Sequence, residues 1–245
     1  MLAGSPAQAG WTTYSAADNG ASTSGPFPNT AAAEADFLSA AAAYGSTRTQ
    51  TFETMPYSFG SWPSGQAVSL GGGTYLTISG AATWELTGVN NTPVYLNLAG
   101  FNVTPDGSKY LSVAGNNFDV MTLTFSFDAP INSFGMDITG IQTQFAESNL
   151  VFSYNDGTAR TQSLSTNSSG GVNFVGFVDS NQVSSVSITY ASWDYWGIDN
   201  IVYNASSNAP EAGGAVPEPA SMALISAGLM GLGLIRRRKA AYRTG

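Results

Sequence analysis

The sequence predicts an all-β protein, a jelly-roll-type β-sandwich with one short N-terminal helix, followed by a C-terminal transmembrane-type helix. Three observations support this prediction. Charged residues make up only 10% of the chain, whereas aromatic residues reach 12% and glycine occurs 28 times, a composition that favours an exported β protein. Several segments alternate apolar and polar residues with a period of two. One apolar run near the C-terminus is closed by consecutive basic residues.

The N-terminal part is expected to hold little structure before one short helix. Residues 1–9 end in Ser5-Pro6-Ala7-Gln8-Ala9, an A-x-A pattern that predicts the remnant of a signal peptide whose beginning lies upstream of Met1. A chance occurrence in an alanine-rich chain is the alternative. Residues 10–28 are rich in Ser, Thr, Gly and Pro and predict a flexible N-terminus. Asn29 or Thr30 can then cap a helix that runs to Ala43.

Residues 29–204 form the predicted domain, the helix followed by ten or more short strands between residues 49 and 203. Alternation is clearest in segments 121–127, 150–154 and 186–190. Each segment has one apolar face and one hydroxyl-rich face, as expected for a strand with one side on the core. Turn sequences separate the strands at Pro105-Asp106-Gly107, Asp128-Ala129-Pro130 and Asn155-Asp156-Gly157.

The composition excludes several classes of site. The chain has no cysteine and no histidine, which excludes disulfides, thiolate zinc sites, a Ser-His-Asp triad and histidine metal ligands. Only three of the eight basic residues precede residue 236, whereas all sixteen acidic residues do. Nucleic-acid binding is therefore not expected. The acidity fits solubility outside the cell, or carboxylates that bind a divalent cation such as calcium.

The C-terminal region is built like a membrane-directed tail. A polar linker at 205–215 leads to residues 216–239, in which an apolar helix is expected at 220–235. This run is short for a bilayer span, which takes about 20 residues, so a buried core helix is the alternative. The basic residues that close the run favour the membrane and keep residues 240–245 at the cytoplasmic end.

The tail resembles the PEP-CTERM sorting tail of Gram-negative bacteria. The resemblance rests on Pro217, Glu218 and Pro219, the apolar helix, and the basic cluster Arg236, Arg237 and Arg238. It implies export by the Sec machinery, membrane insertion through the helix, processing by an exosortase, and delivery to the cell surface or the medium. The family accompanies extracellular polysaccharide and biofilm genes, so a polysaccharide is an expected partner.

Two segments resemble the opening and closing strands of galactose-binding-like jelly rolls, which include many carbohydrate-binding modules. They are Thr49-Gln50-Thr51-Phe52-Glu53 and the stretch from Trp196 to Tyr203 that contains Asp199. The resemblance implies that Glu53 and Asp199 hold a structural calcium ion, which would also relieve their repulsion. The alternative is that both carboxylates cap strand ends or face water.

A group of aromatic residues precedes the last strand. Trp193, Asp194, Tyr195 and Trp196 could stack on the apolar face of a sugar and accept its hydroxyl hydrogen bonds, with Trp62 as a second platform. The alternative is that these rings close the core, since tryptophan is usually largely buried. We therefore expect a non-catalytic structural or carbohydrate-binding surface protein. The alternative, a secreted glycoside hydrolase, would need two carboxylates facing each other across a groove.

Overall fold

The computed structural model describes residues 10–80, 87–93, 98–115, 120–142, 149–154, 159–163, 169–191 and 194–204, which all belong to one compact unit, Met1–Ala209. The predicted signal-peptide remnant, the linker, the sorting tail and the apolar helix at 220–235 lie outside these residues. Within them, no helix has the length and apolarity needed to cross a bilayer.

The described residues form a β-sandwich with a single α-helix, in agreement with the predicted class. The helix α1 spans Pro28–Ala41 and continues as one 3-10 turn, Ala42–Tyr44. The strands are β1 Thr12–Asn19, β2 Thr47–Gln50, β3 Val68–Gly71, β4 Thr74–Gly80, β5 Gly88–Asn90, β6 Tyr110–Ala114, β7 Val120–Thr139, β8 Asn149–Tyr154, β9 Ala159–Ser163, β10 Gly171–Ala191 and β11 Tyr195–Asn204. All their pairings are antiparallel.

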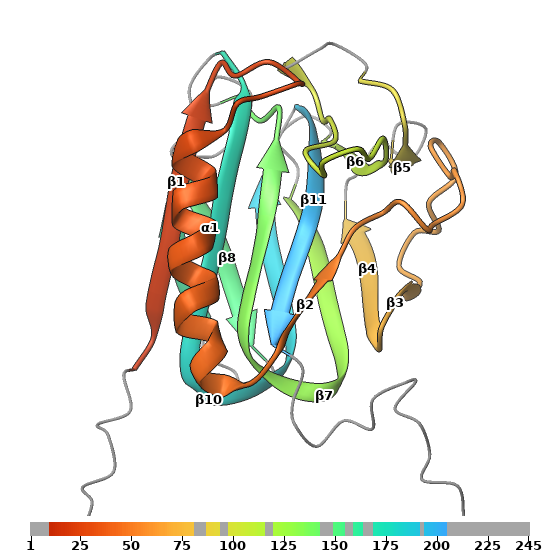
Figure 1. Cartoon of the computed structure of the whole chain (residues 1–245). Coiled ribbons are helices and arrows are strands. Elements are labelled where there is room, and N and C mark those ends of the chain that lie inside the picture. The colour runs from red at the N-terminus through yellow and green to blue at the C-terminus, as the bar shows by residue number, and fades with distance from the viewer. Residues whose placement is uncertain are drawn as a thin grey trace, which may run out of the picture. The chain divides into compact units, whose positions relative to one another are not determined.

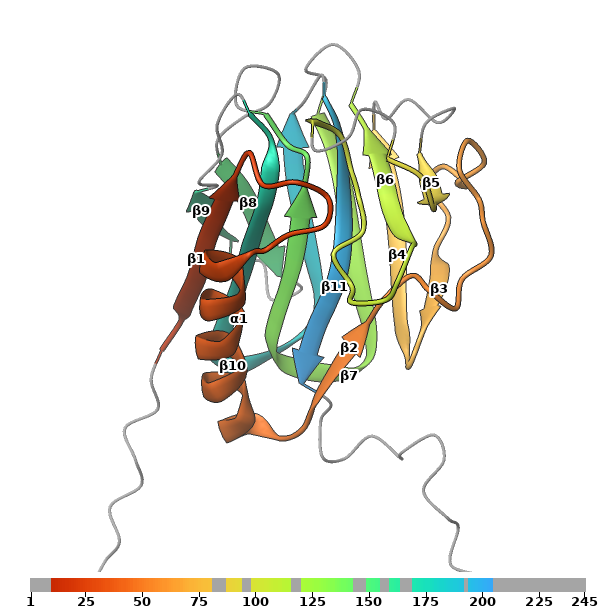
Figure 2. The same ribbon diagram turned by 45° about the horizontal axis from the view of Figure 1, so that its top comes forward.

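The two layers share their two longest strands (Figures 1 and 2). The front layer has the order β1-β10-β7-β11-β6-β5, with β2 paired to the end of β11, and it uses residues 133–139 of β7. The back layer has the order β9-β8-β10-β7-β4-β3 and uses residues 120–127 of β7. Both long strands bend at the lower end of the sandwich, where their register shifts between Val178 and Ser185.

This bend corrects one prediction. Asp128-Ala129-Pro130 was expected to be a turn between two strands, but these residues lie inside β7. They form the corner at which the strand passes from one layer to the other. Asp128 and Pro130 are exposed there, and an irregular register at such a corner tolerates a proline that cannot donate to the ladder.

The core lies between the layers and follows the predicted alternation. In β7 the side chains from Met121 to Phe127 alternate between buried and partly exposed, and Val186 and Ile188 of β10 are buried in the same core. From Ile131 to Thr139, by contrast, every residue of β7 is buried. Both faces of this half of the strand are therefore covered.

The N-terminal segment is more ordered than expected, which corrects the prediction of a flexible stretch at 10–28. Strand β1 pairs with β10 over Thr12–Asn19. Its Asp18 then caps α1, because the carboxylate accepts hydrogen bonds from the backbone N–H groups of Asn29 (3.1 Å) and Thr30 (2.9 Å). Neither Asn29 nor Thr30 is the cap; Phe27 takes that position without a side-chain hydrogen bond, so the helix start is stabilised by a strand partner.

Helix α1 covers one part of the outer face of the front layer. Phe37 and Ala41 of the helix pack on Phe174, Val178 and Val202 of the sheet in a second hydrophobic cluster. The remaining part of this outer face is covered by the segment that leads into β6, residues 98–109, which we call the anchor loop (Figure 2). The candidate site lies where the helix and the anchor loop meet.

Candidate functional site

The anchor loop is fixed to the front layer first by β7 and β11. Thr139 of β7 bonds both backbone groups of Phe101, accepting from its N–H at 2.9 Å and donating to its carbonyl at 3.0 Å. Next to it, Gly100 lies so close to Gly197 of β11 that a Cβ atom on either residue would come within 2.8 Å of the other's Cα. Glycine at both positions lets the loop touch the sheet backbone directly.

Asp199 of β11 holds the middle of the anchor loop. Its side chain is fully buried, and Oδ2 accepts hydrogen bonds from the N–H groups of Val103 (2.9 Å) and Thr104 (3.0 Å). Oδ1 accepts the N–H of Asn200 at 2.9 Å. Burial raises the pKa of Asp199, and these hydrogen bonds act in the opposite direction.

Glu53, from the loop after β2, holds the end of the anchor loop. Its Oε1 accepts hydrogen bonds from the N–H groups of Ser108 (2.8 Å) and Lys109 (2.7 Å). In return, Nζ of Lys109 donates to the carbonyl oxygens of Glu53 (2.9 Å) and Met55 (2.6 Å). The sequence resemblance predicted that Glu53 and Asp199 lie together at one calcium site. In the structure both carboxylates accept hydrogen bonds from backbone N–H groups of the anchor loop.

Calcium binding by Glu53 and Asp199 stays a prediction. The described residues contain no group of three or more acidic side chains arranged to hold a metal ion. Calcium needs 6–8 oxygen ligands, and the carboxylate oxygens named above already accept hydrogen bonds from the backbone. The contacts resemble the alternative considered from the sequence, carboxylates that cap backbone groups.

A β-bulge in β11 shapes the edge of the site. The register with β7 shifts between Asp199 and Val202, and Asn200 in the bulge has a left-handed φ of 45°. Its side chain bridges two elements: Nδ2 donates to Oδ2 of Asp137 at 3.1 Å, and Oδ1 lies 2.8 Å from the hydroxyl of Thr104. Bulges often redirect side chains beside functional sites.

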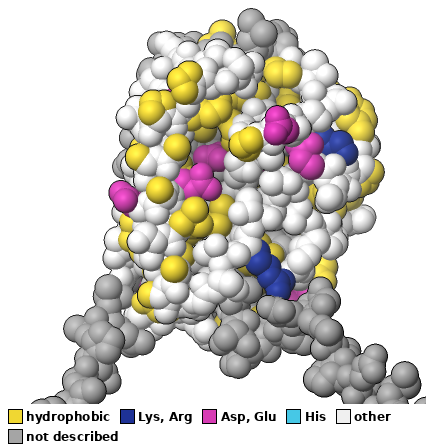
Figure 3. Space-filling model, in the orientation of Figure 1, with side chains coloured by type: hydrophobic (Ala, Val, Ile, Leu, Met, Phe, Trp, Pro, Cys, Tyr) yellow, Lys and Arg dark blue, Asp and Glu magenta, His cyan; other side chains and the backbone are white. Residues whose placement is uncertain are grey.

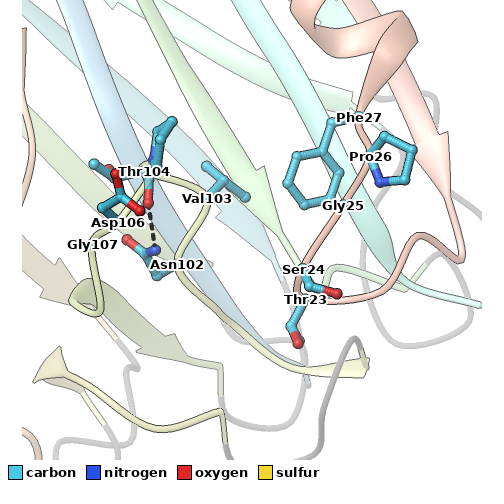
Figure 4. Close-up of a pocket in the computed structure, with 11 residues that line it drawn as sticks. Thr23, Ser24, Gly25, Pro26, Phe27, Asn102, Val103, Thr104, Asp106 and Gly107 are labelled. Atoms are coloured by element: carbon cyan, nitrogen blue, oxygen red, sulfur yellow. Dashed lines mark hydrogen bonds between the residues drawn. The ribbon is translucent and has the colours of Figure 1, made fainter.

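Two adjoining hollows lie between the start of α1 and the anchor loop. The larger has a volume of about 410 Å³ and is lined by residues 23–27 and 102–107. Figure 4 shows Phe27 and Val103 facing one another across it, with Asn102 and Thr104 on the loop side. Oδ1 of Asn102 is buried without a hydrogen-bond partner. The hollow therefore offers an aromatic ring together with amide and hydroxyl groups.

The smaller hollow, which we call the acidic pocket, has a volume of about 230 Å³. It shares Phe27, Val103 and Pro105 with the larger one and adds Glu34 of α1 and Asp137 of β7. Burial raises the pKa of Glu34. Burial, and next the charge of Glu34, raise the pKa of Asp137 well above its usual range. Acidic side chains in the middle of this face have no basic side chain beside them (Figure 3).

Two of the four rings predicted to form an aromatic platform are buried. Trp62 is 3% exposed and Trp196 is fully buried, and both belong to the core between the layers. Their large apolar rings pack on that core, which corrects the prediction that they stack on sugars. Trp193 lies outside the described residues, and Tyr195 is half-buried.

Asp194, expected beside that platform, is a buried structural group. Its carboxylate accepts the N–H of Gln142 at 2.7 Å and the N–H of Tyr195 at 2.8 Å. Burial raises the pKa of Asp194 to about 7 in spite of these two hydrogen bonds. The group therefore carries a proton at mildly acidic pH.

Sequence reasoning missed Glu34 and Asp137. Glu34 stands in an alanine-rich helix and Asp137 in an apolar strand. The stretch Phe134-Gly135-Met136-Asp137-Ile138 places one carboxylate among apolar residues, which could have indicated a site. A buried charge is costly in free energy unless a partner compensates it. The pairing with Glu34 depends on the helix packing across the sheet, which no local pattern encodes.

Comparison with solved structures found distant likeness. The enzymatically active domain of tailspike protein 4 of bacteriophage CBA120 matches 54% of this chain at 14% identity and a TM-score of 0.33, and the chain spans only 19% of that protein. A mutant of CBM29-2, a family 29 carbohydrate-binding module, matches 69% of this chain and 99% of its own length at 10% identity and a TM-score of 0.29. Likeness at this level carries no argument about function.

The C-terminal region gives a clear family match. None of the curated proteins matches the chain, but a model of the PEP-CTERM protein-sorting motif matches residues 215–239. The match covers the tail identified from Pro217, Glu218, Pro219 and the basic cluster. Such a motif implies export, processing by an exosortase and surface localisation, and residues 215–239 of this chain are a PEP-CTERM protein-sorting motif.

Proposed function

We propose that this protein is a non-catalytic, carbohydrate-binding component of a bacterial polysaccharide layer. The sorting motif at residues 215–239 is the observation that carries the proposal. A protein delivered to the cell surface through the Sec machinery and released by an exosortase works among extracellular polysaccharides. In this proposal the β-sandwich, of the jelly-roll type, is the working part, and the tail acts only in sorting.

The proposed binding surface is the larger hollow. Sugars present apolar C–H faces and hydroxyl groups, and such ligands need an aromatic or apolar surface with a few placed polar groups. Phe27 supplies the ring, and Asn102 and Thr104 supply amide and hydroxyl groups from the loop. The clamps of Asp199 and Glu53 keep the loop in place, so the polar groups are held before the ligand arrives.

A pull-down with polysaccharide from the native host tests the binding. The full chain and its Phe27→Ala and Asn102→Ala variants are mixed with the insoluble polymer, and bound protein is quantified. We expect retention to fall by about tenfold in each variant, as removal of one well-placed contact costs about 1.4 kcal/mol. Tyr57→Ala is the matched control, because Tyr57 is 58% exposed and does not line the hollow. Undiminished retention of both variants with unchanged melting temperatures would overturn the surface.

A glycoside hydrolase is the second candidate, because Glu34 and Asp137 line one pocket. Paired carboxylates with separated protonation states can run that reaction. The measurement is the release of reducing ends from the same polysaccharide. The binding proposal predicts none above the Glu34→Gln background. Steady release by the wild type that stops in Glu34→Gln would favour the enzyme.

A further inference from the structure

The acidic pocket has a composition that the proposed sugar surface does not explain. Glu34 and Asp137 line it from α1 and β7, and the other walls are mostly apolar (Phe27, Ala31, Val103, Pro105 and Val172), with Thr30 and Asn200 as further polar residues. Apolar walls lower the local polarity, and a carboxylate in such a place is costly unless a donor or a cation meets it. A leucine side chain at the position of Asp137 would carry no such desolvation cost.

Asp137 is the more deeply buried of the two carboxylates of the pocket. It is 5% exposed, and among the described residues its one side-chain hydrogen bond comes from Nδ2 of Asn200 to Oδ2. Asp137 is also the direct register partner of Asp199 on the neighbouring strand. Like charges in opposed positions destabilise a sheet, so this arrangement favours a positive group on the open side.

Neither Arg48 nor Lys109, the two basic residues whose side-chain contacts the structure describes, supplies that charge. Arg48 donates to the carbonyl of Gly72, and Lys109 donates to the carbonyls beside Glu53. Neither lines the acidic pocket. The electrostatic influences on Asp137 come from Glu34 and Asp199, which are both acidic. Either a proton on Asp137 or a positive group from outside the described residues can offset this repulsion.

We infer that the acidic pocket binds the primary ammonium group of an amino sugar, so that the preferred polymer is a polysaccharide with free, de-N-acetylated amines. The inference rests on the proposed function and names its substrate class. An ammonium has three N–H donors, which suit the two carboxylates of Glu34 and Asp137 that line the pocket. A pocket of about 230 Å³ is smaller than typical ligand sites of roughly 300–1,000 Å³, and it suits one sugar residue whose neighbours lie in the larger hollow.

A divalent metal fits the pocket less well. Calcium takes 6–8 oxygens, whereas the described residues hold no cluster of three acidic side chains, and the pocket contributes two carboxylates, one hydroxyl and one amide among mostly apolar walls. Those walls match the C–H groups of a sugar ring. An ammonium held by two carboxylates also forms charge-assisted hydrogen bonds, the stronger class of hydrogen bond.

The protonation of Asp137 gives the inference a further signature. Glu34 from α1 and Asp199 from β11 face Asp137, and burial and these charges raise its pKa. A bound ammonium favours the charged carboxylate and so lowers that pKa. Binding then releases a proton from the site, and affinity falls as the pH is lowered.

The test is calorimetric titration of the full 245-residue chain with two oligosaccharides of equal length. One is a fully deacetylated glucosamine oligomer and the other is its N-acetylated form. We expect the amine form to bind at least about tenfold more tightly, and Glu34→Gln to weaken it by about tenfold or more, because the variant loses a charge-assisted hydrogen bond. Titration in buffers of different ionisation enthalpy should show proton release, reduced in Asp137→Asn.

Asp36→Asn is the matched control, because Asp36 is an exposed acidic residue of the same helix and does not line the pocket. It should leave affinity unchanged, which separates the pocket from the overall negative charge. Equal binding of both oligomers, or equal binding by Glu34→Gln and wild type, overturns the inference but leaves the proposed function standing. If calcium raises the melting temperature of wild type and not of Glu34→Gln, the pocket is a metal site and the amine assignment fails. If neither oligomer nor the host polymer binds, both proposals fail.

Discussion

Two pairs of carboxylates flank the anchor loop, and they differ in what satisfies them. Glu53 and Asp199 accept hydrogen bonds from four backbone N–H groups of the loop, at Val103, Thr104, Ser108 and Lys109. Glu34 and Asp137 line a pocket, and Asp137 accepts a hydrogen bond from Nδ2 of Asn200. The first pair stabilises the anchor loop through these hydrogen bonds. The second pair accepts fewer hydrogen bonds from the described residues, which is the better indication of a ligand site.

The largest effect is expected from Asp199→Ala. Removing this fully buried carboxylate leaves the backbone N–H groups of Val103, Thr104 and Asn200 without their acceptor. We expect the free energy of unfolding to fall by about 4 kcal/mol, measured by urea denaturation. Asp199→Asn keeps one acceptor oxygen and should lose less. A loss below 1 kcal/mol in the alanine variant would show that the loop does not depend on this clamp.

The next effect is a dependence of stability on pH. The pKa of Asp194 is raised from 3.8 to about 7 in the folded state, so between about pH 4 and 7 the folded chain holds a proton that the unfolded chain has lost. The contribution of Asp194 to stability is therefore highest below about pH 4 and falls by about 4 kcal/mol as the pH rises through this window. The pKa values of Asp137 and Asp199 are also raised, so both groups change the stability in the same direction with pH.

Melting temperatures from pH 4 to 8 measure this effect. Asp194→Asn should flatten the curve, and Asp36→Asn, which changes an exposed carboxylate, should leave its slope unchanged. Identical slopes for wild type and Asp194→Asn would contradict the assignment of the buried proton.

A smaller effect is expected from Glu53→Ala. The side chain is half-buried, and its loss frees the N–H groups of Ser108 and Lys109 close to solvent. We expect a loss of about 1 kcal/mol in urea denaturation, partly restored in Glu53→Gln. The same variant tests the calcium prediction: if Glu53 and Asp199 hold the ion, millimolar calcium raises the melting temperature of chelator-treated wild type but not of Glu53→Ala.

The smallest effect on stability is expected from Glu34→Gln. This variant tests whether the pair Glu34 and Asp137 lacks the structural role of the pair Glu53 and Asp199. No hydrogen bond of the fold depends on this carboxylate among the contacts described above, and its charge lies near Asp137. Removing a like charge should leave the melting temperature unchanged or raise it slightly. A clear destabilisation would mean that Glu34 has a structural role like that of Glu53.

The strands were predictable because the back layer has one face on the core. The alternation of apolar and polar residues from Met121 to Phe127 of β7 follows directly from this burial of one face. The corner at Asp128-Ala129-Pro130 was mistaken for a turn, because the same residues suit a tight turn and a bend between layers. Strand β1 was missed since its residues are short and polar, and its order comes from pairing with β10.

The candidate site was only partly predictable. Sequence resemblance identified Asp199 and Glu53 as a linked pair, but their hydrogen bonds depend on a loop that touches both. Trp62 and Trp196 were assigned to the surface by their chemistry, although size favours the core. Glu34 and Asp137 meet through helix packing on the sheet, so their pocket emerges only in three dimensions.

The most direct test of the account is mass spectrometry of the C-terminal peptide of the protein from its native host, in membrane, surface and medium fractions. We expect the surface form to end near Pro217–Pro219 and to lack residues 220–245, because the sorting motif at 215–239 implies processing by an exosortase. The domain then works outside the cell without its tail. A surface form that keeps Arg236, Arg237 and Arg238 would contradict processing and place the function at the inner membrane.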